Sequence, residues 1–225
     1  MAAEGLRERK KAQMRQQLSD TAARMFLERG FDAVRVAEVA QACGVSTKTV
    51  FNYFPTKEAL VLDRLEATMS SLRTGLAEPG VPPLDAALRI LAAELSVMTA
   101  AFEAAADPAA AMAAHRRFGD LIRATPSLRA YRNDVMDRFV AVAAEAIASR
   151  SGRSPTDPAL QIVAAALLGL WRVQFDSVRN HLGADSTPAH LARAVTADVR
   201  RAAAVLAGGL GPLSTEHDPT PPNPV

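Results

Sequence analysis

Apolar residues recur three and four positions apart along most of the 225-residue chain, and no sustained alternation of β-branched residues interrupts them. Spacing of this kind is typical of amphipathic helices rather than strands. The pattern therefore predicts an all-α protein that begins with a helix over about 9–29. Two short helices are expected at 36–43 and 47–54, and an unbroken long helix, capped by Thr56, is expected over 56–77.

The rest of the chain predicts five further helices, separated by stretches rich in turn-forming residues. They are expected at about 84–105, 108–123, 128–149, 157–181 and 188–207. The final stretch holds five of the 14 prolines and is expected to be disordered. We interpret the chain as an N-terminal domain over 1–58, a larger helical domain over 59–207 and a tail over 208–225.

The two short helices carry the spacing of a helix-turn-helix. Such helices can cross steeply only if the residue at the crossing is small, the turn residue tolerates a left-handed conformation and the inner faces are apolar. Ala40, Gly44 and Val50 meet these demands in order. Ser46 stands where it can cap the second helix. An ordinary helix hairpin, with Gly44 as a simple C-cap, is the alternative.

The outward side of the second short helix favours a DNA-reading role over the hairpin alternative. Thr47, Lys48, Thr49 and Asn52 occupy this side near the helix N-terminus, and such side chains suit base edges and phosphate oxygens. Charge points the same way: residues 1–64 hold 11 lysines and arginines against eight acids, while the net charge of the whole chain is only +2. A basic N-terminal segment on a nearly neutral body indicates a polyanionic partner, either nucleic acid or anionic lipid.

The segment from Phe31 to Leu60 resembles the DNA-binding domain of the TetR family of transcriptional regulators. The resemblance is strongest in Gly44-Val45-Ser46 and in the run TVFNYFPTKEAL at 49–60, and with the first helix it covers about 50 residues. It implies a three-helix DNA-binding domain with a helix-turn-helix, followed by a larger helical ligand-binding and dimerisation domain. Beyond these residues the likeness is one of helical layout alone.

The resemblance implies roles for nine positions in binding double-stranded DNA: Arg35, Ser46, Thr47, Lys48, Thr49, Phe51, Asn52, Tyr53 and Lys57. Thr47 and Lys48 would face bases, whereas Thr49, Tyr53 and Lys57 would meet phosphates, and Asn52 could do either. Two positions depart from the family pattern. Phe51 replaces the usual tyrosine and offers only apolar contact, and Arg35 stands where a threonine is usual and could supply a charged phosphate contact.

Two sets of apolar residues in the larger domain suggest a dimer and a ligand pocket. The expected interface of a homodimer comprises Ile162, Ala166, Gly169, Val173, Leu191, Val195, Val199 and Leu206, although the same residues could simply close the core of one chain. The expected lining of a ligand pocket comprises Met98, Phe102, Met112, Phe118, Phe139, Trp171 and Phe175, with Arg172 or Gln174 as a polar anchor, and plain core packing is the alternative.

Other chemistry is not indicated. The single cysteine, Cys43, is expected to be buried and inert, and the four histidines lack the spacing of a metal site. No nucleophile motif or phosphate loop occurs, so neither an enzyme nor a cofactor is expected. The longest apolar run, Ile162–Trp171, is shorter than the ~18 residues of a membrane helix, and the N-terminus lacks the apolar region of a signal peptide. We therefore expect a cytoplasmic protein.

Together these observations predict a dimeric repressor that binds a palindromic operator and leaves it when a small, largely apolar effector enters the larger domain. The helix over 56–77 is the expected lever between the two domains. A regulator of the same fold that responds to a protein partner or to nothing is the first alternative, and a helical enzyme is the second.

Overall fold

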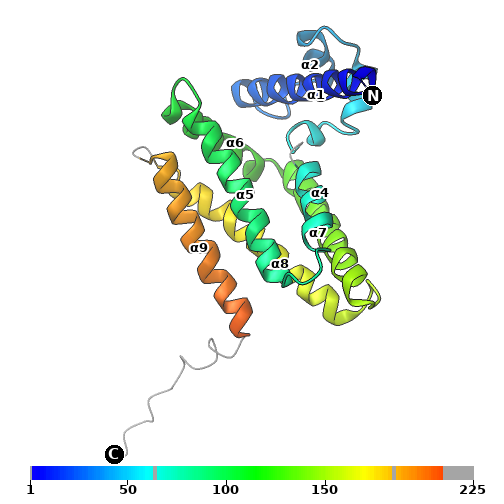
Figure 1. The fold of residues 1–225 in the computed structure, drawn as a ribbon. Helices are drawn as coiled ribbons and strands as arrows, with labels where there is room; N and C mark the ends of the chain where they lie inside the picture. Colours follow the sequence, from blue (N-terminus) through cyan, green and yellow to red (C-terminus); the bar gives the residue numbers. More distant parts are fainter. Residues whose placement is uncertain (1, 63–64, 184–185, 210–225) are drawn as a thin grey trace, which may run out of the picture. The chain divides into compact units, whose positions relative to one another are not determined.

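The computed structural model describes residues 2–62, 65–183 and 186–209, and every regular element in these ranges is a helix (Figure 1). The all-α prediction is therefore confirmed. In chain order the elements are α1 (Ala2–Arg29), α2 (Val36–Ala42), α3 (Thr47–Tyr53), the 3-10 turn η1 (Glu58–Leu60), α4 (Leu65–Gly75), α5 (Pro83–Glu103), α6 (Pro108–Ala124), α7 (Pro126–Ser151), α8 (Pro158–His181) and α9 (Pro188–Gly208). The expected disordered tail lies almost wholly outside the described residues.

Local start signals account for the good agreement of the later helices with the sequence prediction. Each helix from α5 to α9 begins with proline, whose fixed φ suits the first helical position and whose missing N–H has no partner there. Asp157 and Thr187 cap α8 and α9 by accepting hydrogen bonds from the backbone N–H groups of Ala159 and His190. As a result, the ends of these five helices fall within two residues of their predicted positions.

The prediction of an unbroken helix over 56–77 is wrong. Thr56 does cap the segment, because its hydroxyl accepts a hydrogen bond from the N–H of Ala59 at 3.2 Å. Only the 3-10 turn η1 follows, and α4 starts at Leu65. Ala59, Leu60 and Val61 are all buried, whereas successive residues of an α-helix point about 100° apart and cannot all face one core. The Leu60 carbonyl also accepts a hydrogen bond from Ser19, which competes with continuation of the helix.

The chain divides into two compact units, and the first contains residues 1–70 and 113–138. Its core is formed where the buried face of α1 meets α2 and α3, with Leu18, Phe26, Val39 and Val50 among its members. Gly44 makes the turn between α2 and α3 with φ of 68°, a left-handed conformation that residues with a side chain rarely adopt. The predicted helix-turn-helix is therefore present.

The first unit also includes the elbow between α6 and α7, which the sequence did not predict. Ile122 from α6 and Leu128 from α7 are buried members of the same core as the helix-turn-helix. Thr125, between them, is buried as well. The division between the two units falls within α6 and within α7, so these helices belong to both units.

The second unit contains residues 71–112 and the chain from 139 onward, and α5, α8 and α9 pack together in it (Figure 1). Its core uses one face of each helix, including Leu91 of α5, Leu167 of α8 and Val195 of α9. By length and hydropathy alone α8 could cross a membrane, with a mean hydropathy of 1.3 over its most apolar window. One face of α8 packs against α5 and α9, and a single helix of this kind is weak evidence for a membrane span.

Candidate nucleic-acid interface

The helix α3 presents a polar N-terminal surface while its inner side closes the core. Val50 is fully buried, whereas Lys48 and Asn52 are exposed and Thr47 is half-buried. Phe51, a large apolar ring, is 47% exposed. This arrangement leaves the side chains at the start of α3 accessible, which a helix needs in order to read base edges in a major groove.

Ser46 and Thr49 form the N-cap of α3. The backbone N–H of Thr49 donates to Ser46 Oγ at 3.0 Å, and the two hydroxyl oxygens lie 2.8 Å apart, so one donates to the other. These contacts fix the first turn of the helix and confirm the predicted capping role of Ser46. They also bring the Thr49 hydroxyl back towards the cap, whereas the backbone phosphates are the partner that the family resemblance implies for it.

Lys57 lies against aromatic rings of the core. Its Nζ atom is 4.3 Å from the ring centroid of Phe31 and 5.7 Å from that of Phe26, and the side chain is half-buried. A cation over the face of an aromatic ring is attracted by the ring quadrupole. Lys57 therefore has a structural partner in addition to the phosphate that the family resemblance implies, and sequence reasoning missed this contact.

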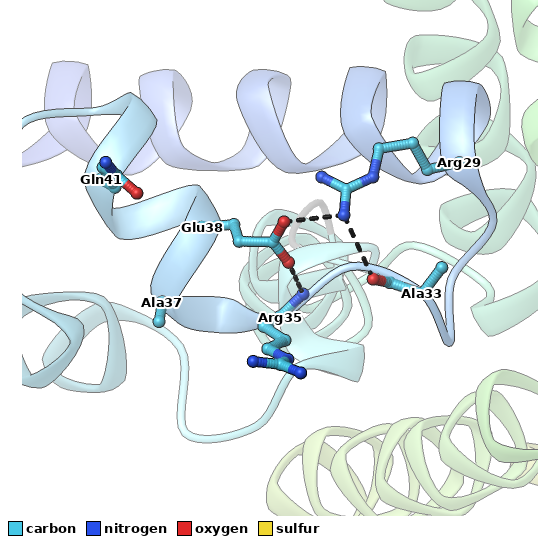
Figure 2. A pocket seen from close by; sticks show the side chains of 6 residues that line it. All are labelled: Arg29, Ala33, Arg35, Ala37, Glu38 and Gln41. Atoms are coloured by element: carbon cyan, nitrogen blue, oxygen red, sulfur yellow. Dashed lines mark hydrogen bonds and ion pairs between the residues drawn. The ribbon is translucent and has the colours of Figure 1, made fainter.

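Arg35 precedes α2, and its neighbours form a network that Figure 2 shows from close by. One carboxylate oxygen of Glu38 accepts from the backbone N–H of Arg35, and the other accepts from Arg29, both at 2.7 Å. Arg29 also donates to the carbonyl of Ala33 at 3.3 Å. Glu38 thus satisfies the free N–H at the start of α2, where this chain lacks a threonine, and it leaves the guanidinium of Arg35 exposed.

This network lines a surface hollow of about 380 Å³, bounded by Arg29, Ala33, Arg35, Ala37, Glu38 and Gln41 (Figure 2). The backbone N–H of Arg35, followed by the hydrogen bond from Arg29, holds the pKa of Glu38 below its usual range. The carboxylate therefore stays ionised at neutral pH. It pairs with Arg29 at 2.7 Å, whereas the side chain of Arg35 is exposed.

Arg15 is a positioning residue that sequence reasoning missed. Its Nη1 atom donates to the carbonyl of Tyr53, the last residue of α3, at 3.1 Å. Its guanidinium carbon also lies 4.8 Å from the ring centroid of Phe54. Arg15 therefore ties α1 to the C-terminal end of α3 across 38 positions of sequence. No local signal marks such a contact, because an arginine on a helix is more often solvated.

The residues expected to line a ligand pocket differ in burial, and they do not all belong to the same unit. Phe102, Met112, Phe139 and Trp171 are buried, Met98, Gln174 and Phe175 are half-buried, and Arg172 is exposed. Phe118 lies in the first unit and packs against its core. Trp171 donates its indole N–H to Glu94 at 3.0 Å, which joins α8 to α5. Glu94 is a polar group of this region that the sequence did not single out.

The residues expected at the dimer interface also divide into two groups. Leu191, Val195 and Val199 of α9 are buried within one chain, so their assignment to an interface is corrected: they are core residues. Ile162 is 71% exposed, Leu206 is 37% exposed, Gly169 is exposed, and Ala166 and Val173 are half-buried. The open apolar surface therefore lies mainly on α8.

Cys43 and the histidines can be placed in part. Cys43 is half-buried rather than fully buried, and its Sγ atom lies 3.9 Å from the carbonyl of Gln17. His181 lies 3.0 Å from the Asp198 carboxylate, which also accepts a hydrogen bond from Ser177 at 2.6 Å. Across the described ranges, histidine, cysteine and acidic side chains nowhere gather in threes that could hold a metal ion. His217 lies outside the described residues.

A helix-turn-helix whose second helix is capped, anchored at both ends and exposed along its polar side defines a DNA-binding regulator. Residues 18–63 match the family model of bacterial regulatory proteins of the tetR family. Residues 91–210, more than half of the chain, match the model of the MftR C-terminal domain. The chain therefore belongs to the TetR family of transcriptional regulators, as its sequence motif predicts.

Individual proteins agree with this assignment. MftR of Mycobacterium tuberculosis, whose name assigns it to transcriptional regulation of mycofactocin biosynthesis, is 29% identical over 153 residues, which are 68% of this chain and 73% of that protein. LuxR of Vibrio harveyi, an HTH-type transcriptional regulator, is 47% identical over 47 residues, which are 21% of this chain and 23% of LuxR.

The chain is also similar to solved structures. Thermus thermophilus FadR, a TetR-family repressor in complex with lauroyl-CoA, has a TM-score of 0.49 and 21% identity, with 94% of this chain and 99% of that chain covered. GusR of Salmonella enterica has a TM-score of 0.49 and 21% identity, with 87% of this chain and 94% of that chain covered.

Proposed function

We propose that this regulator is a cytoplasmic homodimeric repressor that reads a palindromic operator with α3 and leaves it when a small, largely apolar ligand enters the second unit. The observation that carries the DNA-reading part is the exposed start of α3, where Lys48 stands beside Thr47 and ahead of Asn52 while Val50 anchors the helix in the core. A helix held in this way presents the same side chains to every site it meets, which sequence discrimination requires.

Substitution of Lys48 tests the reading role. A good base contact is worth about 1–3 kcal/mol of discrimination, so Lys48→Ala should narrow the gap in affinity between the best operator and a scrambled duplex. The operator is first selected from a pool of random duplexes with the wild-type protein, and the affinities are then measured by fluorescence anisotropy. Loss of the same factor on both duplexes would contradict a base contact by Lys48.

The open face of α8 supports the dimer. Ile162, Ala166, Gly169 and Val173 recur at helical spacing along one side, and a Cβ atom added at Gly169 would meet no atom within 4 Å. The backbone of a second helix can approach such a strip closely. An isologous contact of this kind would place two copies of α3 about a two-fold axis, as a palindromic site demands.

The dimer is tested by charging one of two exposed apolar residues, Ile162 on α8 or Val97 on α5. Ile162→Glu should split the dimer because it places a charge in the contact, whereas Val97→Glu, at a residue of α5 that is 69% exposed, should leave it intact. Sedimentation at micromolar concentration distinguishes the two. A monomeric wild type, or an Ile162→Glu variant that remains dimeric, would count against this interface.

The ligand response is tested by a thermal-shift screen of apolar metabolites, followed by operator binding with each hit. Coupling is reciprocal, so a ligand that weakens operator binding must itself bind more weakly to the DNA complex, commonly by a factor of about 5–150. The relative MftR is named for mycofactocin biosynthesis, which makes promoters of such genes one source of operator candidates. A ligand that leaves DNA affinity unchanged would favour control by a protein partner.

A further inference from the structure

The first helix is longer than the core against which it packs. α1 has 28 residues, which corresponds to a length of about 42 Å. Among its residues from 9 onward, Leu18 is the first that is fully buried, Met14 is partly buried, and residues 9–13 are all exposed. Residues 9–13 of α1 therefore extend by more than one turn, on the order of 7 Å, past its contacts with the core.

This extension is rich in positive charge. The chain before residue 16 contains five lysines and arginines but only two acids, and it includes two of the four lysines, Lys10 and Lys11. Both lysine side chains are exposed. They precede Met14 and Arg15 by four residues, and side chains four apart lie on one side of a helix. Lys10 and Lys11 therefore continue, beyond the core, the side of α1 that faces the helix-turn-helix.

Arg15 places this side of α1 next to the C-terminal end of α3. Its bond to the Tyr53 carbonyl holds α1 at the C-terminal end of α3, and Lys11 follows one turn, about 5.4 Å, further along. α3 has seven residues and is about 10 Å long, close to the ~12 Å width of a major groove. Phosphates border the groove on both sides, so a cation just beyond the end of an inserted α3 stands near the backbone.

We infer that Lys10 and Lys11 form a second DNA contact, which binds the phosphate backbone beside the groove that α3 occupies. The inference rests on the proposed reading of DNA by α3, because that reading brings the extension to the duplex. The contact adds affinity without reading sequence. It also makes binding more sensitive to salt, since each phosphate that is neutralised releases condensed counterions.

The variant Lys10→Gln/Lys11→Gln removes both charges and keeps good helix-forming residues. Each lost phosphate contact lowers the slope of log K against log salt by about 0.9, so the slope should fall by ~1.8 for each chain bound. The affinity deficit of the variant should consequently shrink by about tenfold per chain between 50 and 200 mM salt. The loss should be equal on operator and scrambled duplexes, and Lys10→Arg/Lys11→Arg should restore the slope.

A matched control removes two charges from exposed positions of the second unit, Arg73→Gln/Arg89→Gln, and should leave the slope unchanged. Circular dichroism of each variant checks that helix content is kept. If the Lys10→Gln/Lys11→Gln variant keeps the wild-type slope, this inference is wrong, and the two lysines are solvent-exposed side chains that do not contact DNA. A wild-type protein that binds no selected duplex at any salt concentration would instead overturn the proposed function itself.

Discussion

Lys57 offers a measurement that separates a structural role from a DNA-binding role in one side chain. Lys57→Met keeps most of the apolar stem but removes the ammonium that lies 4.3 Å from the Phe31 ring centroid and 5.7 Å from that of Phe26. A cation–π contact is worth about 0.5–1 kcal/mol at exposed sites and about 2 kcal/mol when desolvated. Since Lys57 is half-buried, we expect a loss of about 1 kcal/mol, equivalent to about 2–4 °C in Tm for a chain of this size.

The DNA-binding role of Lys57 is measured on the same variant. A contact to one phosphate should lower the slope of log K against log salt by about 0.9, equally on operator and scrambled duplexes. Lys48→Met serves as the control for stability, because the Lys48 side chain is exposed and its loss should leave Tm unchanged. An unchanged Tm in Lys57→Met would refute the cation–π argument. A lowered Tm with an unchanged slope would confine Lys57 to the core and refute its phosphate contact.

Two further predictions concern the polar cluster of α8 and α9 and the elbow between α6 and α7. Leu128→Ala should destabilise the protein by about 2–5 kcal/mol in thermal or denaturant unfolding and weaken operator binding, because Leu128 is fully buried in the core of the helix-turn-helix; a loss below 1 kcal/mol would contradict this. The hydrogen bond from Ser177, followed by that from His181, holds the pKa of Asp198 below its usual range. The ionised carboxylate therefore stabilises the fold above its unfolded pKa of ~3.9, and this contribution disappears as the pH falls through the lower folded value. The Tm deficit of Asp198→Asn at pH 7 should accordingly shrink below about pH 4, and a deficit independent of pH would refute the assignment.

Much of the fold could be predicted because its signals are local. Proline at the first position of five helices, the caps at Ser46, Asp157 and Thr187, and the left-handed turn at Gly44 each act within a few residues of the boundary they set. The outward position of Lys48 on α3 follows from the same spacing that buries Val50. Sequence reasoning therefore predicted which side of α3 is exposed as well as the elements around it.

The supports of that surface depend on contacts between distant parts of the chain, which periodicity does not reveal. Arg15 contacts the end of α3 across 38 positions, and Leu128 enters the first-unit core from α7. The position of an apolar stripe on a helix likewise does not reveal whether it packs within its own chain or against another chain. Val195 and Ile162 both lie on helical stripes, yet Val195 is buried within its own chain and Ile162 is 71% exposed. Core and interface require the same side chains, so only the packing of the whole unit distinguishes them.

The break between η1 and α4 changes how a ligand response could reach α3. A continuous helix over 56–77 would have moved as one rod, but the regular elements of this segment are the short turn η1 and a separate helix α4 from Leu65, and the Leu60 carbonyl is held by Ser19. Rotation of α4 therefore need not rotate the segment beside α3. The helices α6 and α7, by contrast, each run unbroken from residues of the second unit into the elbow, where Ile122 and Leu128 are part of the first-unit core. Close-packed cores resist small displacements and shift between discrete arrangements, so movement of either helix must repack the helix-turn-helix. A ligand response that starts in the second unit could therefore reach the helix-turn-helix along α6 and α7 as well as along α4, because all three helices contain residues of both units.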